Sequence, residues 1–158
     1  MKDVRPTSGK VLQALFNILG DINNFKFLDL FAGTGRVGLE ALERGAEFIA
    51  FVESVRDRAD KIKSLKILNN LNSLILSLEV KRAITWLVKR EYKFDVIFAD
   101  PPYNLDWGKN FLAINNLNKL LTPESILVFE RSKREDLILN LNYELISTRD
   151  YGETVLEF

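Results

Sequence analysis

The 158-residue sequence contains no histidine and no cysteine. Without histidine there can be no Ser-His-Asp triad and no imidazole base, and without cysteine there is no thiolate nucleophile. A zinc site would lack its two commonest ligands, so we expect no metal site. Catalysis would have to use carboxylates, amides, hydroxyls, lysine, tyrosine or backbone groups.

The sequence also lacks a disulfide framework, a secretory signal and a long apolar run. Charged residues follow Met1 directly, and no apolar run approaches the roughly 20 residues that a bilayer requires. The 22 basic and 22 acidic residues balance, so the net charge does not indicate a nucleic-acid partner. We expect one cytoplasmic domain over residues 1–158, with an N-terminal segment 1–24, a core 25–158 and no membrane association.

Short apolar runs alternate with amphipathic stretches along most of the chain. This alternation is typical of an α/β fold in which helices cover both faces of a mostly parallel sheet. The last two strands would form a hairpin joined through residues 150–152, which makes the final strand antiparallel to its neighbour. Thr7 or Ser8 would cap the first helix. The expected strands are 27–31, 48–52, 74–80, 94–99, 125–130, 143–147 and 154–158, and the expected helices are 11–19, 37 to the glycine at 45, 55–71, 83–89, 110–121 and 133–139.

A glycine-rich turn follows the first expected strand. Gly33, Gly35 and Gly38 match G-x-G-x-x-G between a strand and a helix, a spacing that favours nucleotide binding. Glu53 ends the next strand, where a carboxylate can accept hydrogen bonds from two ribose hydroxyls. Asp29 lies four residues before Gly33, and a carboxylate there suits a ligand with an ammonium group better than a pyrophosphate. S-adenosylmethionine is therefore favoured, and a nicotinamide-dependent oxidoreductase is the alternative.

A second motif, Asp100-Pro101-Pro102-Tyr103, follows the fourth expected strand. Two prolines cannot continue a strand, because they have no N–H and a fixed φ, so they predict a rigid loop. The carboxyl end of this strand would open onto the same cleft as the glycine turn. Asp100 and the Pro101 carbonyl could accept the two hydrogens of an exocyclic base amine, and Tyr103 could stack on the base. The motif predicts methyl transfer to that amine, although a Pro-Pro turn without chemistry would look the same.

Together with Arg5-Pro6-Thr7, Leu15-Phe16-Asn17 and Tyr151-Gly152-Glu153-Thr154, these motifs make the sequence resemble the class I S-adenosylmethionine-dependent methyltransferases. Within that class it is similar to the RsmD family, which methylates guanine N2 in 16S ribosomal RNA. The resemblance covers nearly the whole chain. It implies a Rossmann-like fold with a mostly parallel seven-stranded sheet, S-adenosylmethionine as cofactor, and a monomer acting on 16S ribosomal RNA in a small-subunit assembly particle. By this resemblance Asp29, Phe31, Gly33, Thr34, Gly35, Glu53 and Ala83 would bind the cofactor, Asp100, Pro101, Pro102 and Tyr103 would hold the target amine, and Arg5 and Thr7 would lie close to the substrate.

The sequence departs from the family pattern at several positions, two of which bear directly on its activity. Arg82 stands where the family usually has an acid or asparagine that meets the adenine, and only four residues precede Arg5 where the family has a longer extension. These departures leave a non-catalytic RNA-binding domain as an alternative. A DNA adenine-N6 or cytosine-N4 methyltransferase is another, although this short chain has no target-recognition domain. Basic residues outnumber acidic ones in 56–66 and in 81–93, and these clusters could meet phosphates.

Overall fold

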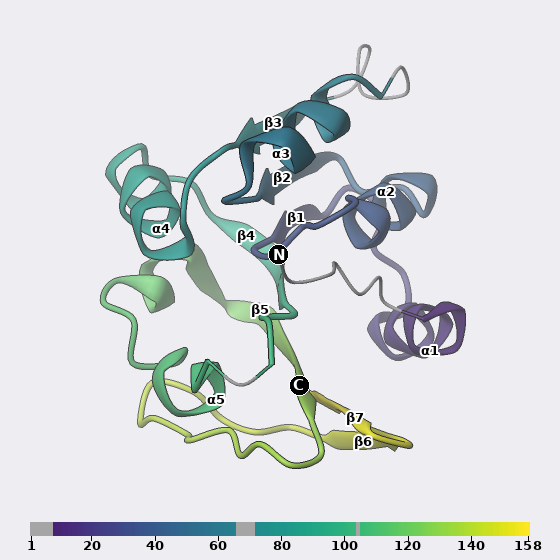
Figure 1. The fold of residues 1–158 in the computed structure, drawn as a ribbon, viewed down its shortest axis with the longest axis vertical. Helices are drawn as coiled ribbons and strands as arrows, with labels where there is room; N and C mark the ends of the chain where they lie inside the picture. Colours follow the sequence, from purple (N-terminus) through teal and green to yellow (C-terminus); the bar gives the residue numbers. More distant parts are fainter. Residues whose placement is uncertain (1–7, 66–71, 104) are drawn as a thin grey trace.

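The computed structural model describes residues 8–65, 72–103 and 105–158. Within these ranges, seven strands form one sheet in the order β3-β2-β1-β4-β5-β7-β6 (Figure 1). β3, β2, β1, β4 and β5 are parallel, whereas β7 runs antiparallel to both β5 and β6. The predicted mostly parallel sheet with an antiparallel C-terminal strand is confirmed. The strands are β1 Lys26–Asp29, β2 Phe48–Val52, β3 Ser73–Leu76, β4 Phe94–Ala99, β5 Leu121–Ser132, β6 Thr148–Tyr151 and β7 Thr154–Glu157.

Alternate residues of a strand point to opposite faces of the sheet, and helices cover the apolar side chains on both faces. Phe27 of β1 packs in a core with α1, α2 and α3, whereas its neighbour Leu28 packs in a second core with α4 and the chain that follows α5. Figure 1 shows the same division, with α1 and α2 on one side of β1 and α4 and α5 on the other. No helix in the described ranges is long and apolar enough to cross a bilayer. The helices are α1 Gly9–Leu19, α2 Arg36–Glu43, α3 Arg56–Lys63, α4 Val80–Lys89 and α5 Trp107–Asn110, with a 3₁₀ turn η2 Leu117–Leu120.

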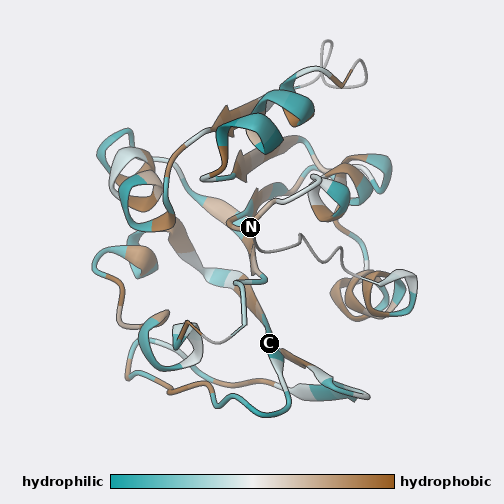
Figure 2. Cartoon of the chain, in the orientation of Figure 1, coloured by the Kyte–Doolittle hydropathy of each residue, from teal (hydrophilic) through white to brown (hydrophobic). Residues whose placement is uncertain are grey.

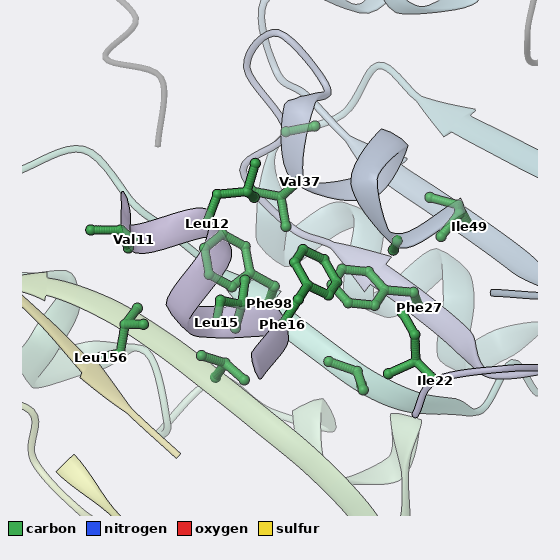
Figure 3. Packing of buried hydrophobic residues seen from close by; sticks show 14 of the residues in the cluster. Val11, Leu12, Leu15, Phe16, Ile22, Phe27, Val37, Ile49, Phe98 and Leu156 are labelled. Carbon is green, nitrogen blue, oxygen red and sulfur yellow. The ribbon is translucent and has the colours of Figure 1, made fainter. Parts of the chain in front are cut away.

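The first helix, α1, closes one side of the molecule. Its N-cap is Ser8, as predicted, and the Ser8 hydroxyl accepts a hydrogen bond from the Val11 N–H at 3.2 Å. Leu15 and Phe16 are fully buried, and the Phe16 ring stacks on Phe27 of β1 with 6.1 Å between centroids (Figure 3). Figure 2 shows the contrast between hydrophobic β2 and β3 and the largely hydrophilic α3 that covers them. The packing of α1 against β1 therefore fixes the strand whose carboxyl end carries part of the predicted site.

Several predicted elements are wrong in the last third of the chain. The expected helix 110–121 does not form: α5 ends at Asn110, turns follow, and η2 begins only after Asn116, whose φ of 69° is left-handed. Residues 133–139 form no helix, because the Ile138 N–H donates to the carbonyl of Gly108 at 2.8 Å rather than within a helix of its own.

The sixth strand lies at 148–151, later than the predicted 143–147. Tyr151 pairs with Thr154, so the hairpin turns on Gly152 and Glu153 rather than on residues 150–152, and Gly152 has a φ of 65°. The helix predicted for 55–71 ends at Lys63, and residues 66–71 lie outside the described ranges.

The third glycine of the motif, Gly38, lets α2 lie close to β2. A Cβ at Gly38 would be 2.3 Å from Cε1 of Phe51 and 3.1 Å from Cγ2 of Ile49, and Phe51 is fully buried. We expect Gly38→Ala to lower the free energy of unfolding by about 2 kcal/mol in urea titration, because an overpacked core must shift. Gly9→Ala is the matched control, since among the described residues its Cβ would meet only the end of the Arg36 side chain at 3.5 Å, and it should change stability by less than about 0.5 kcal/mol. Equal stability of the two variants would contradict this account of the motif.

Candidate functional site

The glycine turn forms a tight connection between the carboxyl end of β1 and α2. Gly33 and Gly35 have φ of 58° and 84°, a left-handed conformation that glycine adopts without a Cβ clash. The Gly35 N–H donates to the Ala32 carbonyl at 2.8 Å, and the Ala32 N–H donates to Val52 of β2 at 2.9 Å. These bonds fix the turn above the sheet edge, where ligands of open α/β folds bind.

Glu53, which follows β2, is bonded to the glycine turn. Its Oε1 accepts a hydrogen bond from the Gly33 N–H at 2.9 Å, and its Oε2 accepts one from the Val55 N–H at 2.7 Å. The side chain is buried, and the two backbone donors provide each of its oxygens with a hydrogen bond. Each carboxylate oxygen keeps a second lone pair, so the residue can still accept hydrogen bonds from two hydroxyls of a ligand. Glu53 therefore supports the turn and can contact a ligand at the same time.

Asp29, the last residue of β1, is a buried acid. It is 1% exposed, and among the described residues neither carboxylate oxygen has a partner at normal hydrogen-bond distance. Burial is the main cause that raises the pKa of Asp29, to about 7, and the nearby carboxyl groups of Asp100 and Glu53 add to the rise. The backbone N–H groups of Gly38 and Phe31 oppose the rise in pKa only in part. Buried carboxyl groups normally have partners, so this one indicates a site for a cation.

The strand register explains why these three acids lie together. Asp29 is opposite Phe51 of β2 on one side and opposite Phe98 of β4 on the other. Glu53 and Asp100 each lie two residues beyond those partners, so the three carboxyl groups sit at the same edge on three adjacent strands. The repulsion among the carboxyl groups of Asp29, Glu53 and Asp100 makes this edge of the sheet, the acid edge, favourable for a positively charged ligand.

The loop after β4 carries the second predicted motif. Pro101 is buried, Pro102 is exposed, and Asp100 and Tyr103 are half-buried. The motif therefore begins at the acid edge and ends on a partly exposed aromatic ring. Its prolines end β4 at Ala99, as the sequence predicted.

The remaining predicted site residues differ in their exposure. Phe31 is half-buried and Thr34 is exposed, both in the connection that carries the glycines. Ala83 is fully buried and packs into the core under α4, so the structure does not bring its methyl group to an open surface. Arg5 and Thr7 lie outside the described residues.

Two features of the site were not predicted from the sequence. One is the pair of backbone hydrogen bonds to Glu53, which no residue pattern encodes. The other is Trp107, whose ring meets Phe31 edge to face with 5.2 Å between centroids. A tryptophan four residues after the Pro-Pro loop was the signal that could have identified it.

Comparison with known proteins identifies the family. The model of the family described as conserved hypothetical protein 95 matches residues 1–158. Ribosomal RNA small subunit methyltransferase D of Buchnera aphidicola is 32% identical over 90% of this chain and 75% of its own length. The protein of the same name from Haemophilus influenzae is 30% identical over 94% of this chain and 79% of its own.

The solved structures share this fold. A hypothetical protein of Thermus thermophilus superposes with a TM-score of 0.78 at 29% identity, covering 97% of this chain and 86% of that one. The fold is the Rossmann-like fold of the class I methyltransferases, as the resemblance implied. This chain belongs to the conserved hypothetical protein 95 family, which is the RsmD family of methyltransferases.

Proposed function

We propose that this protein transfers a methyl group from S-adenosylmethionine to the exocyclic N2 amine of a guanine in 16S ribosomal RNA, in the cytoplasm and on a small-subunit assembly particle. The observation that carries the proposal is the group of acids Asp29, Glu53 and Asp100 on adjacent strand ends, between a glycine turn and a Pro-Pro loop. Each of these groups has a role in the chemistry of the proposed reaction.

The acid edge fits the charges of S-adenosylmethionine. This ligand carries an ammonium and a sulfonium group and supplies an activated methyl group. The Asp29 carboxylate, which has no hydrogen-bond partner within the described ranges, can accept a hydrogen bond from the ammonium, and Glu53 can accept from the ribose hydroxyls. A pyrophosphate at the same place would face three carboxyl groups, which disfavours the nicotinamide-dependent alternative.

The Pro-Pro loop supplies the groups that act on the target amine. The lone pair of an exocyclic amine is delocalised into the base, and it must be drawn out before the nitrogen attacks a methyl group. The Asp100 carboxylate and the Pro101 carbonyl can each accept one amine hydrogen, which favours a tetrahedral nitrogen with its lone pair free. Asp100 or water can then take the proton that leaves after methylation, and Tyr103 stacks on the base.

Ribosomal RNA is supported as substrate by the relatives and by the surface charge. The relatives from Buchnera aphidicola and Haemophilus influenzae are named as methyltransferases of the small-subunit ribosomal RNA. On α4, the side chains of Lys81, Arg82 and Lys89 are exposed, and the helix contains no acid. These cations can contact phosphates. The chain as a whole is neutral, which favours presentation of the target by an assembled particle over tight binding of naked RNA.

The test is methyl transfer to defined acceptors. Small ribosomal subunits from a strain that lacks the gene, naked 16S ribosomal RNA and duplex DNA would each be incubated with the protein and radiolabelled S-adenosylmethionine. We expect transfer mainly to the subunits, with the label mapped by mass spectrometry to the N2 position of a guanine. Transfer to DNA, or binding of S-adenosylmethionine without transfer to any acceptor, would contradict the proposal.

A further inference from the structure

Trp107 connects the two loops that border the site. It is the first residue of α5, and its ring meets the Phe31 ring edge to face at 5.2 Å with an interplanar angle of 73°. Phe31 comes from the glycine-turn connection, whereas Trp107 follows the Asp100–Tyr103 loop. The contact therefore places an indole where the cofactor side of the site meets the target side.

The position of Trp107 is fixed by its neighbour Gly108. A Cβ on Gly108 would lie 2.0 Å from the carbonyl oxygen of Asp136, so only glycine allows this approach of two backbones. The Gly108 carbonyl accepts a hydrogen bond from the Ile138 N–H at 2.8 Å, and the Asn110 side-chain amide donates to the Asp106 carbonyl at 3.0 Å. The backbone that carries the indole therefore has little conformational freedom, which lowers the entropy lost when a ligand stacks on the ring.

The chain's other tryptophan, Trp86, differs from Trp107 in what covers its ring. The guanidinium of Arg90 covers its ring at 3.8 Å, and Tyr92 stacks beside it at 6.1 Å. Trp107 is half-buried, as Trp86 is, and it packs partly against the core, but its ring contact in the described part of the chain is the edge-to-face one with Phe31. Part of a large, rigid aromatic surface therefore remains accessible directly after the target-binding loop.

We infer that Trp107 is a positioning residue whose exposed ring surface stacks on a nucleobase of the RNA substrate beside the target guanine. The inference rests on the proposed function, because it takes Asp100–Tyr103 as the target-binding loop. Aromatic stacking on bases does not depend on sequence and contributes substantially to binding of unpaired RNA. Trp107 and Tyr103 would hold two neighbouring bases, so that the target amine reaches Asp100 in one orientation.

The kinetic test distinguishes an effect on RNA binding from an effect on cofactor binding. We expect Trp107→Leu to raise KM for undermethylated small subunits about tenfold, with kcat within about threefold of wild type and calorimetric affinity for S-adenosylmethionine unchanged. Trp107→Phe should restore most of the affinity for the subunits. Weaker cofactor binding with an unchanged KM for subunits would place the indole in the cofactor pocket and overturn the inference.

Fluorescence gives a second measurement that does not depend on activity or on the folding of Trp107→Leu. Trp86→Phe leaves Trp107 as the one tryptophan, and Trp107→Phe leaves Trp86 as the one tryptophan. At concentrations high enough to saturate weak binding, a single-stranded, guanine-containing RNA oligonucleotide should quench the emission of the first variant and not of the second. The inference is overturned if only the second variant is quenched or if neither is. If the wild type methylates no subunit, the proposed function fails, whereas an active wild type with an unaffected Trp107→Leu variant refutes only the role of Trp107.

Discussion

Asp100→Ala should reduce methyl transfer about 1,000-fold while leaving the affinity for S-adenosylmethionine nearly unchanged. In the proposed mechanism the Asp100 carboxylate accepts an amine hydrogen and the departing proton, and removal of such a group typically slows an enzyme by about 10²–10⁴-fold. Because Asp100 lies on the loop after β4, its loss leaves the glycine turn and the Glu53 hydrogen bonds intact. Single-turnover transfer and calorimetric titration of the cofactor measure the two effects separately.

Two further variants sharpen this prediction. Asp100→Asn keeps an oxygen acceptor and removes the charge, so its rate should lie between those of Asp100→Ala and wild type. Asp106→Asn removes a carboxylate a few residues further along, at an exposed position with a φ of 56° that asparagine tolerates well. That control should keep the wild-type rate. Near-normal turnover of Asp100→Ala, or an equal loss in Asp106→Asn, would refute the role of the loop.

The centre of the fold could be predicted from sequence because its signals are local. β2 and β4 were predicted with their observed bounds, since a buried parallel strand is a short, nearly continuous apolar run. The glycine turn and the Pro-Pro loop were predicted because glycine and proline restrict the backbone in known ways. Their meeting at one sheet edge followed from the parallel direction of β1 and β4.

The chain between β5 and β6 could not be predicted because tertiary contacts decide its path. Residues 133–139 have a helical pattern, yet the Ile138 N–H bonds to Gly108, and Gly108 allows that approach only through its missing side chain. In the site, the sequence placed Asp29 and Glu53 at strand ends. It could not show that backbone N–H groups satisfy Glu53 while Asp29 lacks a partner at normal hydrogen-bond distance in the described part of the chain, because that difference depends on the geometry of the folded turn.

This difference predicts that the affinity for S-adenosylmethionine depends on pH. The pKa of Asp29 in the free protein is raised to about 7 by burial and by the carboxyl groups of Asp100 and Glu53. An ammonium group beside Asp29 favours the ionised form, so binding at lower pH must first remove the proton. Between pH 7.5 and pH 5.5 the dissociation constant should rise about 20-fold, and calorimetry in buffers of different ionisation enthalpy should detect the released proton.

The contribution of Asp29 to the stability of the free protein should change with pH in the opposite direction to the affinity for S-adenosylmethionine. A carboxyl group whose pKa is higher in the folded than in the unfolded state keeps its proton longer when folded, so Asp29 lowers stability as pH rises from about 4 to about 7. Asp29→Asn should be more stable than wild type at pH 8 and should bind S-adenosylmethionine more weakly, with little dependence on pH between 5.5 and 7.5. A wild-type affinity that is flat over this range, or an equal slope in Asp29→Asn, would contradict the assignment. The chain has no histidine, so few other groups titrate in this range and the slope can be attributed to Asp29.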